Sequence, residues 1–266
     1  MPAPTNQFKK RLKAGEQQIG FWLGMGSANA AEIAGGAGFD WLLIDGEHGP
    51  NDITSLLAQM HALQGSNSSP VIRPVVGENW MLKQILDIGC QTILVPMVDT
   101  AEQARELVRA VNYPPTGVRG VGAALARASY HNRTSDYLQT ANDEVCLLVQ
   151  IETQKGLANL DQILQVEGID GVFIGPADMA ADMGYLGKPA APEVQEAVQN
   201  GLRKIVAAGM PAGILMAIPE LVEKYLEIGA TFVAVGTDVT SFAGATDALA
   251  NKWKGSSENT AEKGVY

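Results

Sequence analysis

Cysteine is scarce in this chain of 266 residues, which contains only two, Cys90 and Cys146. Both lie inside apolar runs, where a free cysteine behaves as a small hydrophobic residue. Two cysteines in such positions cannot form the framework of a small disulfide-built secreted domain. We therefore expect both side chains to be buried in the core.

Basic residues are also scarce, and long apolar runs are absent. The chain has 19 Lys and Arg against 29 Asp and Glu, a net charge of −10, which disfavours nucleic acid and anionic lipid as partners. No segment approaches the roughly 18 apolar residues of a membrane helix, and residues 1–13 lack the apolar region of a signal peptide. We predict a cytoplasmic protein with no nucleic-acid or membrane partner.

The chain does contain a regular alternation of two kinds of segment. Segments with helical apolar spacing, several of which end in glycine, separate short apolar runs that are typical of parallel strands buried on both faces. Eight such units in about 250 residues predict an α/β fold, a single-domain (β/α)₈ or TIM barrel. The predicted strands are Ile19–Gly24, Trp41–Asp45, Val71–Val76, Thr92–Met97, Val145–Ile151, Gly171–Ile174, Ala212–Met216 and Phe232–Val235.

Two regions do not fit the bare barrel. Residues 112–140 form a long insertion between the fourth and fifth strands, for which we expect a structured lid or a subunit contact. Residues 255–266 are polar and rich in small side chains, which is typical of a flexible C-terminal tail. The barrel domain is therefore predicted to span residues 1–254.

Polar residues at the carboxyl ends of the predicted strands are the candidate catalytic groups, because barrel enzymes build their active sites there. Arg73 lies in the third apolar run, where a guanidinium requires an anionic partner, and we favour a ligand over a structural ion pair. His48 follows the second strand and is a candidate general acid or base. Asp45 either orients the same loop, holds a metal-bound water or caps a turn.

Two carboxylates end neighbouring strands. Glu152 closes the fifth strand and Asp178 follows the sixth, so both are expected at one rim, and Gln150 faces the same side as Glu152. Unpaired carboxylates at close range repel each other, and a divalent cation relieves the repulsion. Oxygen donors alone favour Mg²⁺ or Mn²⁺. The alternative is a pair of solvated rim carboxylates.

Two kinds of cofactor chemistry are disfavoured. Gly24 and Gly26, with Asp45 further on, imitate a dinucleotide site, but Asn29 stands where the third glycine belongs, which argues against NAD. No lysine lies within the eight apolar runs. We therefore expect neither a Schiff-base lysine nor PLP, and carbanion stabilisation has to come from a metal.

Four separated segments resemble the signature motifs of the metal-dependent, class II pyruvate aldolases of the HpcH/HpaI family. They are FDWLLIDGEHGP (39–50), PVIRP (70–74), QIET (150–153) and FIGPAD (173–178). The resemblance covers residues 6–254 and includes YPPTGVRG (113–120). Four motifs in the family's order make a chance agreement improbable.

The resemblance implies how the substrate and a cation are held. Glu152 and Asp178 would bind a divalent cation, Mg²⁺, Mn²⁺ or Co²⁺, which pyruvate chelates through its keto and carboxylate oxygens. Gln150, Gly175 and the backbone around Ala177 and Asp178 would hold the substrate, which suits a carboxylate at a helix start.

The resemblance also implies three catalytic residues. Arg73 would stabilise the developing enolate, and His48 would act as the base, directly or through water. Asp87 would raise the basicity of His48, yet it precedes the fourth strand, at the opposite end of its own barrel. Because Asp87 could reach His48 only from a neighbouring subunit, we predict a homo-oligomer, with a hexamer as one option.

The predicted activity is reversible aldol cleavage of a 4-hydroxy-2-oxoacid into an aldehyde and pyruvate, or an analogue such as hydroxypyruvate. Trp22, Leu215 and Met216 are candidates for lining the aldehyde pocket, although Trp22 can equally plug the barrel. The alternatives are a related metal-enolate lyase, an oxaloacetate decarboxylase and a non-catalytic acid-binding module. The expected partners are a small 2-oxoacid and an aldehyde.

Overall fold

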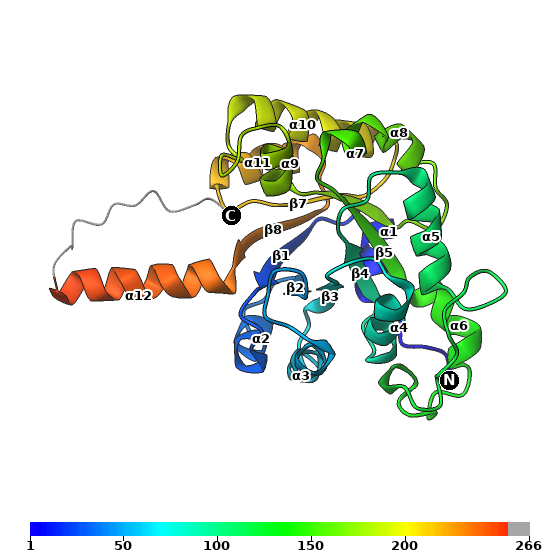
Figure 1. Ribbon diagram of the computed structural model, residues 1–266. Helices are drawn as coiled ribbons and strands as arrows, with labels where there is room; N and C mark the ends of the chain where they lie inside the picture. Colours follow the sequence, from blue (N-terminus) through cyan, green and yellow to red (C-terminus); the bar gives the residue numbers. More distant parts are fainter. Residues whose placement is uncertain (255–266) are drawn as a thin grey trace.

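The computed structural model describes residues 1–254, which fold around a closed barrel of eight parallel strands (Figure 1). Each strand pairs with its neighbours in sequence order, and the first also pairs with the eighth. The predicted (β/α)₈ barrel is confirmed, whereas the predicted tail, residues 255–266, lies outside the described residues. The strands are β1 (Gln18–Leu23), β2 (Trp41–Asp45), β3 (Ser69–Arg73), β4 (Thr92–Val95), β5 (Cys146–Ile151), β6 (Gly171–Ile174), β7 (Ala212–Leu215) and β8 (Phe232–Thr237).

All eight predicted strands are present, but two of them end more than one residue earlier than expected. β3 ends at Arg73 and β4 ends at Val95. The next residues are Pro74 and Pro96, which lack the N–H group that would continue the ladder. The residues that follow each proline therefore leave the sheet and become loops at the mouth of the barrel.

Helices follow the strands and cover the outside of the barrel (Figure 1). Capping boxes at Asp52 and Thr100 fix the starts of two of them. Within residues 1–254, no helix combines the length and the apolar composition needed to cross a bilayer. These outer helices are α2 (Ala28–Gly35), α3 (Ile53–Ala62), α4 (Asn79–Asp87), α5 (Ala101–Val111), α7 (Gln154–Ala158), α8 (Leu160–Ile163), α9 (Pro176–Asp182), α10 (Pro192–Ala207) and α11 (Pro219–Ile228).

Aromatic side chains fill the barrel interior, and α1 (Gln7–Lys13) closes its amino-terminal end. Phe8, on α1, is fully buried, and its ring centroid lies 5.9 Å from those of Trp41 and Phe232. A Cβ on Gly213 would lie 2.1 Å from the Phe232 ring, so only glycine fits at this position. Sequence reasoning assigned no role to α1, which leaves the carboxyl-terminal end as the open mouth.

Both cysteines are free and buried, as expected from their apolar surroundings. Cys90 packs in the core between the strands and the outer helices, whereas Cys146 belongs to the barrel interior. Burial raises the pKa of Cys90 to about 12 and that of Cys146 well above its ordinary value. Neither thiol is therefore ionised near neutral pH, and both act as packing residues.

The insertion, residues 112–140, contains the 3₁₀ helix η1 (Arg127–Ser129) and the start of α6 (Tyr137–Glu144). Arg127 donates to the carbonyl of Ile88, at the end of α4 (2.9 Å), and the Asp136 N–H donates to the carbonyl of Met1 (3.0 Å). These contacts place the segment against the amino-terminal side of the barrel. Whether the insertion acts as a lid or as a subunit contact remains a prediction.

The last helix, α12 (Asp238–Lys254), extends away from the barrel (Figure 1). Its first residue is fixed, because Asp238 accepts hydrogen bonds from the N–H groups of Gly24 (2.8 Å) and Met25 (3.1 Å). Beyond that point, several large apolar side chains are exposed, including Phe242, Leu249 and Trp253. The helix thus carries an apolar surface that the barrel of its own chain does not cover.

Phe8→Ala is expected to lower the free energy of unfolding by about 3–5 kcal/mol, because it leaves a cavity where α1 plugs the barrel. Ile33, which is 78% exposed on α2, gives the control. Ile33→Ala should change the stability by less than about 0.5 kcal/mol. Urea denaturation followed by circular dichroism measures both variants, and equal, small effects would contradict the role of Phe8 as a plug.

Candidate active site

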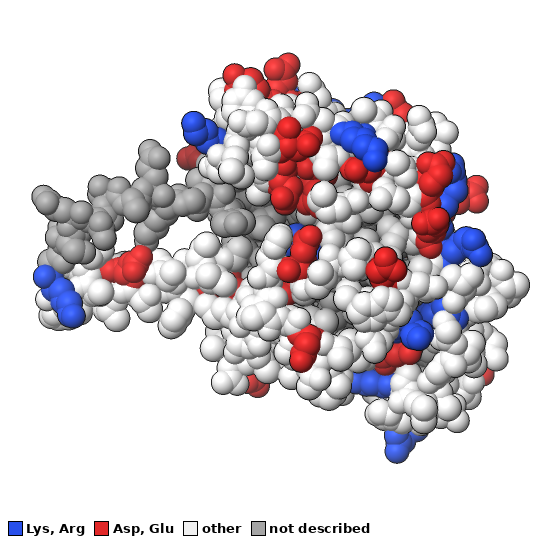
Figure 2. Space-filling model, in the orientation of Figure 1, with Lys and Arg blue, Asp and Glu red and all other residues white. Residues whose placement is uncertain are grey.

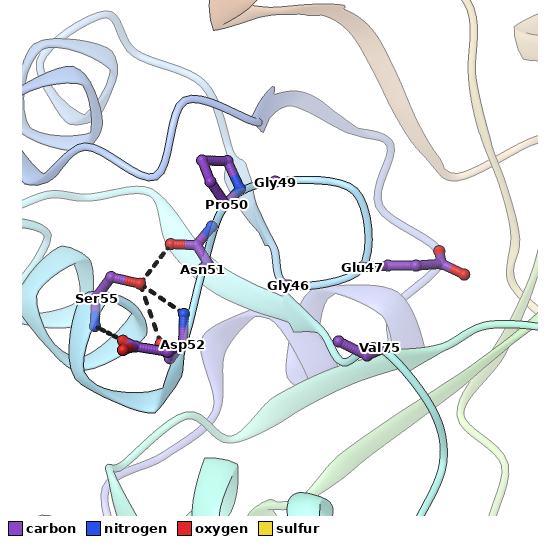
Figure 3. A pocket seen from close by; sticks show the side chains of 8 residues that line it. All are labelled: Gly46, Glu47, Gly49, Pro50, Asn51, Asp52, Ser55 and Val75. Atoms are coloured by element: carbon purple, nitrogen blue, oxygen red, sulfur yellow. Dashed lines mark hydrogen bonds between the residues drawn. The ribbon is translucent and has the colours of Figure 1, made fainter.

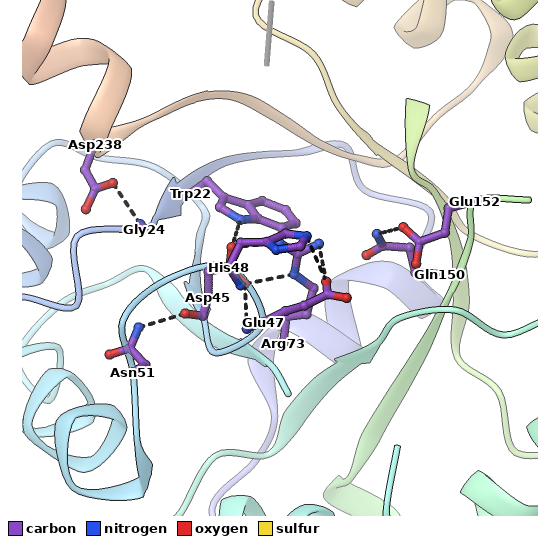
Figure 4. A network of polar contacts seen from close by, with 10 residues as sticks. All are labelled: Trp22, Gly24, Asp45, Glu47, His48, Asn51, Arg73, Gln150, Glu152 and Asp238. Atoms are coloured by element: carbon purple, nitrogen blue, oxygen red, sulfur yellow. Dashed lines mark hydrogen bonds and ion pairs between the residues drawn. The ribbon is translucent and has the colours of Figure 1, made fainter. Parts of the chain in front are cut away.

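The carboxyl ends of β2 and β3 hold a buried ion-pair network (Figure 4). Asp45 and Arg73 are register partners, and Arg73 donates from Nε to Oδ1 (2.9 Å) and from Nη2 to Oδ2 of Asp45 (2.7 Å). Its Nη1 lies 2.8 Å from Glu47 Oε2. The structural ion pair, which sequence analysis weighed against a ligand as the partner of Arg73, is therefore present. It fixes the guanidinium at the barrel mouth, and a ligand role for its remaining N–H groups stays a prediction.

Asp45 also holds the loop that follows β2. Its Oδ1 accepts a hydrogen bond from the Glu47 N–H (3.0 Å), and its Oδ2 accepts one from Trp22 Nε1 (3.1 Å). Burial by itself raises the pKa of Asp45, but the hydrogen bonds and the charge of Arg73 outweigh burial, so the pKa is lowered. Sequence analysis offered three roles for Asp45, and these contacts support the one in which it orients the loop after β2.

Trp22 lies in the barrel interior and does not line an open rim. Its ring centroid is 5.7 Å from that of Phe173, and the Arg73 Cζ lies 4.9 Å from the Trp22 ring. Trp22 therefore fills the barrel interior, which was the alternative to lining the aldehyde pocket. Its ring forms a cation–π contact with the Arg73 guanidinium. Leu215 is half-buried against the same interior cluster. Met216 packs in the outer core, so its expected place in the aldehyde pocket is wrong.

Glu152, directly after β5, is a buried carboxylate that is only 2% exposed. Its Oε1 accepts a hydrogen bond from the Met97 N–H (2.7 Å), and its Oε2 accepts one from Gln150 Nε2. Burial raises the pKa of Glu152 to about 7; the two hydrogen bonds act to lower it, and the charges of Glu47 and Asp178 raise it. None of the ion pairs within residues 1–254 includes this carboxylate, and those at the mouth join Arg73 to Asp45 and Glu47.

Asp178 lies in the first turn of α9, exposed at the mouth. The charge of Asp178 helps to raise the pKa of both Glu152 and Glu47, so the three carboxylates act on one another at the mouth. Gly175, just before the helix, has no room for a side chain, because a Cβ would lie 2.6 Å from Glu152 Oε2. The structure thus brings together Gln150, Glu152, Gly175, Ala177 and Asp178.

His48 and Asp87 lie far apart within one chain. The His48 side chain is 66% exposed at the edge of the site, with Nε2 3.8 Å from Glu47 Oε2. Asp87 ends α4 at the opposite end of the barrel, where its Oδ1 lies 2.7 Å from Nη2 of the fully buried Arg119. A contact between Asp87 and His48 across subunits therefore stays a prediction.

Sequence reasoning missed two contributors to the site. Glu47 was assigned no role, although its place between Asp45 and His48 was a usable signal; burial raises its pKa, the charge of Arg73 lowers it, and Asp45 raises it. Met97 contributes only its main-chain N–H, from a left-handed backbone conformation (φ 57°). No side-chain pattern in the sequence carries a signal for such a group.

Unpartnered oxygens gather at the mouth, and acidic side chains gather around the centre of the face in Figure 2. Gln150 Oε1 and Glu47 Oε2 are buried without a hydrogen-bond partner. Arg73 Nη1 forms an ion pair with Glu47 Oε2, but the two groups are not aligned as a hydrogen bond. No three His, Cys, Asp or Glu residues cluster as a metal cage within residues 1–254. Mg²⁺ often takes only one or two carboxylates and keeps several waters, so this donor set fits a hard divalent cation.

A cavity of about 450 Å³ opens beside Glu47, between the loops that follow β2 and β3 (Figure 3). The Asn51 side chain donates to the carbonyl of Asp45 (2.7 Å), so the wall of this cavity is tied to the ion-pair network. The space is large enough for a small organic acid. Its lining includes Gly46, Glu47, Gly49, Pro50, Asn51 and Val75.

The fold and the mouth together define a (β/α)₈-barrel enzyme with an acid–guanidinium site at the carboxyl ends of its strands. The model of the HpcH/HpaI aldolase/citrate lyase family matches residues 18–245, and the chain belongs to that family. The family predicted from the four sequence motifs is confirmed.

Similar proteins agree with this assignment. A hydroxypyruvate/pyruvate aldolase from Agrobacterium fabrum is 58% identical over 266 residues, 100% of both chains. A 4-hydroxy-2-oxo-heptane-1,7-dioate aldolase from Shigella sonnei is 56% identical over 261 residues, 98% of this chain and 99% of that protein. The crystal structure of a family member from Burkholderia cenocepacia matches with a TM-score of 0.90 and 36% identity, over 94% of this chain and 100% of that one. The predicted class, a carbon–carbon lyase of the aldolase type, is confirmed.

The raised pKa of Glu152 predicts how the stability of metal-free protein depends on pH. A carboxyl group whose pKa rises from 4.5 to about 7 on folding contributes fully to stability below pH 4.5, and the contribution is lost as the pH rises through 7. The loss is about 3 kcal/mol, and Glu152→Gln should not show it. Urea unfolding of chelator-treated wild type and variant at several pH values measures the difference. Parallel pH profiles would contradict the raised pKa.

Proposed function

We propose that this enzyme reversibly cleaves 4-hydroxy-2-oxoacids into an aldehyde and pyruvate or hydroxypyruvate. The observation that carries the proposal is the buried Glu152 carboxylate, which forms no ion pair in the described chain and whose pKa is raised further by the charge of Asp178. Arg73 lies across the mouth from it (Figure 4). The relatives named as hydroxypyruvate/pyruvate aldolase and 4-hydroxy-2-oxo-heptane-1,7-dioate aldolase support this substrate class.

Glu152 and Asp178 are the proposed ligands of a divalent cation, Mg²⁺, Mn²⁺ or Co²⁺. When bound, such a cation supplies Lewis-acid polarisation of the oxygen atoms of a 2-oxoacid. Gln150 orients Glu152 through its Nε2 and presents its unpartnered Oε1 to the same space. The backbone around Ala177 and Asp178, at the start of α9, is the proposed contact for the substrate carboxylate.

Arg73 is the proposed stabiliser of the enolate that forms when the carbon–carbon bond breaks. Asp45 holds two of its nitrogens and Glu47 faces the third, so the guanidinium is already oriented before the substrate arrives. A fixed donor of this kind acts where the charge develops and needs no reorganisation during the reaction. Loss of one such donor typically costs about 3–4 kcal/mol of transition-state stabilisation.

His48 is the proposed base. In the cleavage direction it accepts the proton of the C4 hydroxyl group, directly or through a water, the C3–C4 bond breaks, and its electron pair remains on the pyruvate fragment. A proton then returns to C3. Because the His48 side chain is 66% exposed, it can exchange its proton with solvent between turnovers.

The exposed helix α12 supports a homo-oligomer. It has 17 residues, and Phe242, Leu249 and Trp253 on it are 65%, 60% and 77% exposed. A helix that extends from its own barrel without tertiary packing is marginally stable in water, so a second copy of the chain is the proposed cover. In such an assembly, the partner subunit's Asp87 could approach His48.

EDTA is expected to abolish aldol cleavage, and Mg²⁺ or Mn²⁺ to restore it, because the cation would supply Lewis-acid polarisation that Arg73 alone does not. Glu152→Gln should stay inactive after metal addition. Glu193→Gln, on the exposed first turn of α10, should behave as wild type. Pyruvate release measures the activity. Borohydride added with pyruvate is expected to leave the protein mass unchanged, and a lysine adduct would overturn the proposal.

Mixing two inactive variants tests the cross-subunit role of Asp87. His48→Ala and Asp87→Ala should each lose most activity alone, whereas subunits exchanged between them should regain activity, because a mixed pair rebuilds one intact site. Mixing His48→Ala with the double variant rebuilds none and is the control. Assays after subunit exchange, with light scattering for the assembly state, give the result. Full activity of a monomer would contradict the shared site.

A further inference from the structure

The loop that follows β4, residues 96–99, is attached to the end of β5 at three successive positions. The Met97 N–H donates to Glu152 Oε1 (2.7 Å), and the Val98 N–H donates to the Gln150 carbonyl (3.0 Å). Asp99 Oδ1 then accepts a hydrogen bond from Thr153 Oγ1 (2.5 Å). The 96–99 loop thus runs beside residues 150–153 and ends in a bond between two side chains.

Met97 holds an uncommon backbone conformation within this loop. Its φ of 57° is left-handed, a region that residues other than glycine, asparagine and aspartate seldom adopt. Its side chain is 50% exposed, so packing of that side chain does not hold the conformation in place. Such a conformation persists only where surrounding contacts determine it. Those contacts are the hydrogen bond from the Met97 N–H to Glu152 and the hydrogen bonds that hold Asp99, two residues further along the loop.

Asp99 is the most firmly held residue of the 96–99 loop. Its side chain accepts a hydrogen bond from Thr153, and its carbonyl accepts one from Asn159 Nδ2 (2.8 Å). Its N–H donates to Gln103 Oε1 (2.8 Å). Its Oδ2 lies 3.5 Å from Lys155 Nζ, an exposed ion pair that is worth little. Because α5 and both ends of α7 contribute partners, Asp99 is a fixed point that orients the Met97 N–H.

We propose that Asp99 and Thr153 are positioning residues that, through the Met97 N–H, hold the Glu152 carboxylate in the orientation that binds a divalent cation. The inference rests on the metal site of the proposed function. Gln150 restrains only Oε2, so without the Met97 N–H the other oxygen of a 2%-exposed carboxylate has no donor. Groups that orient metal ligands in this way typically contribute roughly 10- to 100-fold to metal affinity.

Mn²⁺ binding to metal-free protein, measured by isothermal titration calorimetry, tests the proposal without relying on turnover. Asp99→Ala is expected to raise the Kd for Mn²⁺ roughly 10- to 100-fold. Asp99→Asn keeps an acceptor oxygen for Thr153 and should stay close to the wild-type Kd. Lys155→Ala removes only the exposed ion pair and should leave the Kd unchanged.

Thr153 needs a matched pair of variants, because its Oγ1 also accepts from the Gly156 N–H (2.9 Å) at the start of α7. Thr153→Ser keeps the hydroxyl group and should bind Mn²⁺ as wild type, whereas Thr153→Val should weaken binding. This pair also decides the question if Asp99→Ala does not fold. Faster amide exchange of residues 96–99 in the weakened variants is the expected accompanying change.

Two results would overturn the inference in different ways. If Asp99→Ala and Thr153→Val lower the melting temperature but bind Mn²⁺ as wild type, the bond between these side chains is structural only, and the proposed metal site stands. If Glu152→Gln itself binds Mn²⁺ as wild type, the metal site of the proposed function is wrong, and the positioning role is overturned with it.

Discussion

The burial of one carboxylate without a matching cation is the constraint on which this active site depends. Glu152 is almost fully enclosed where β5 meets the barrel mouth, and its ionised form is therefore disfavoured. The Met97 N–H and the Gln150 amide hold its two oxygens in place but bring no net charge. A bound divalent cation would offset the cost of burying this charge.

The same electrostatics divide the mouth into two sides. At the ends of β2 and β3, Arg73 pairs with Asp45 and Glu47, and the lowered pKa of Asp45 favours its ionised form. At the ends of β5 and β6, Glu152 and Asp178 add negative charge, and within residues 1–254 neither of them forms an ion pair. A fixed guanidinium on one side and the proposed divalent cation on the other would suit a 2-oxoacid whose oxygens gain charge during the reaction.

The sequence predicts the part of the site that depends on position along the chain. Buried strands and glycine-terminated helices set the barrel, and strand ends then place Arg73, Gln150 and Glu152 at one mouth. The sequence does not predict the features that depend on where a side chain or a main-chain group points in the folded chain. Trp22 lies within the expected first strand but points inward beside Phe173. Helix α1 plugs the barrel without belonging to the repeat, and the 96–99 loop acts through main-chain N–H groups that any residue except proline carries.

The most direct test of the central claim is the position of a bound cation. Crystals grown with Mn²⁺ and pyruvate allow anomalous scattering to locate the ion independently of any assay. A single peak between the carboxylates of Glu152 and Asp178, with Arg73 still paired to Asp45, is the predicted result. An active enzyme whose peak lies elsewhere, or whose Glu152 carboxylate contacts no ion, would contradict it.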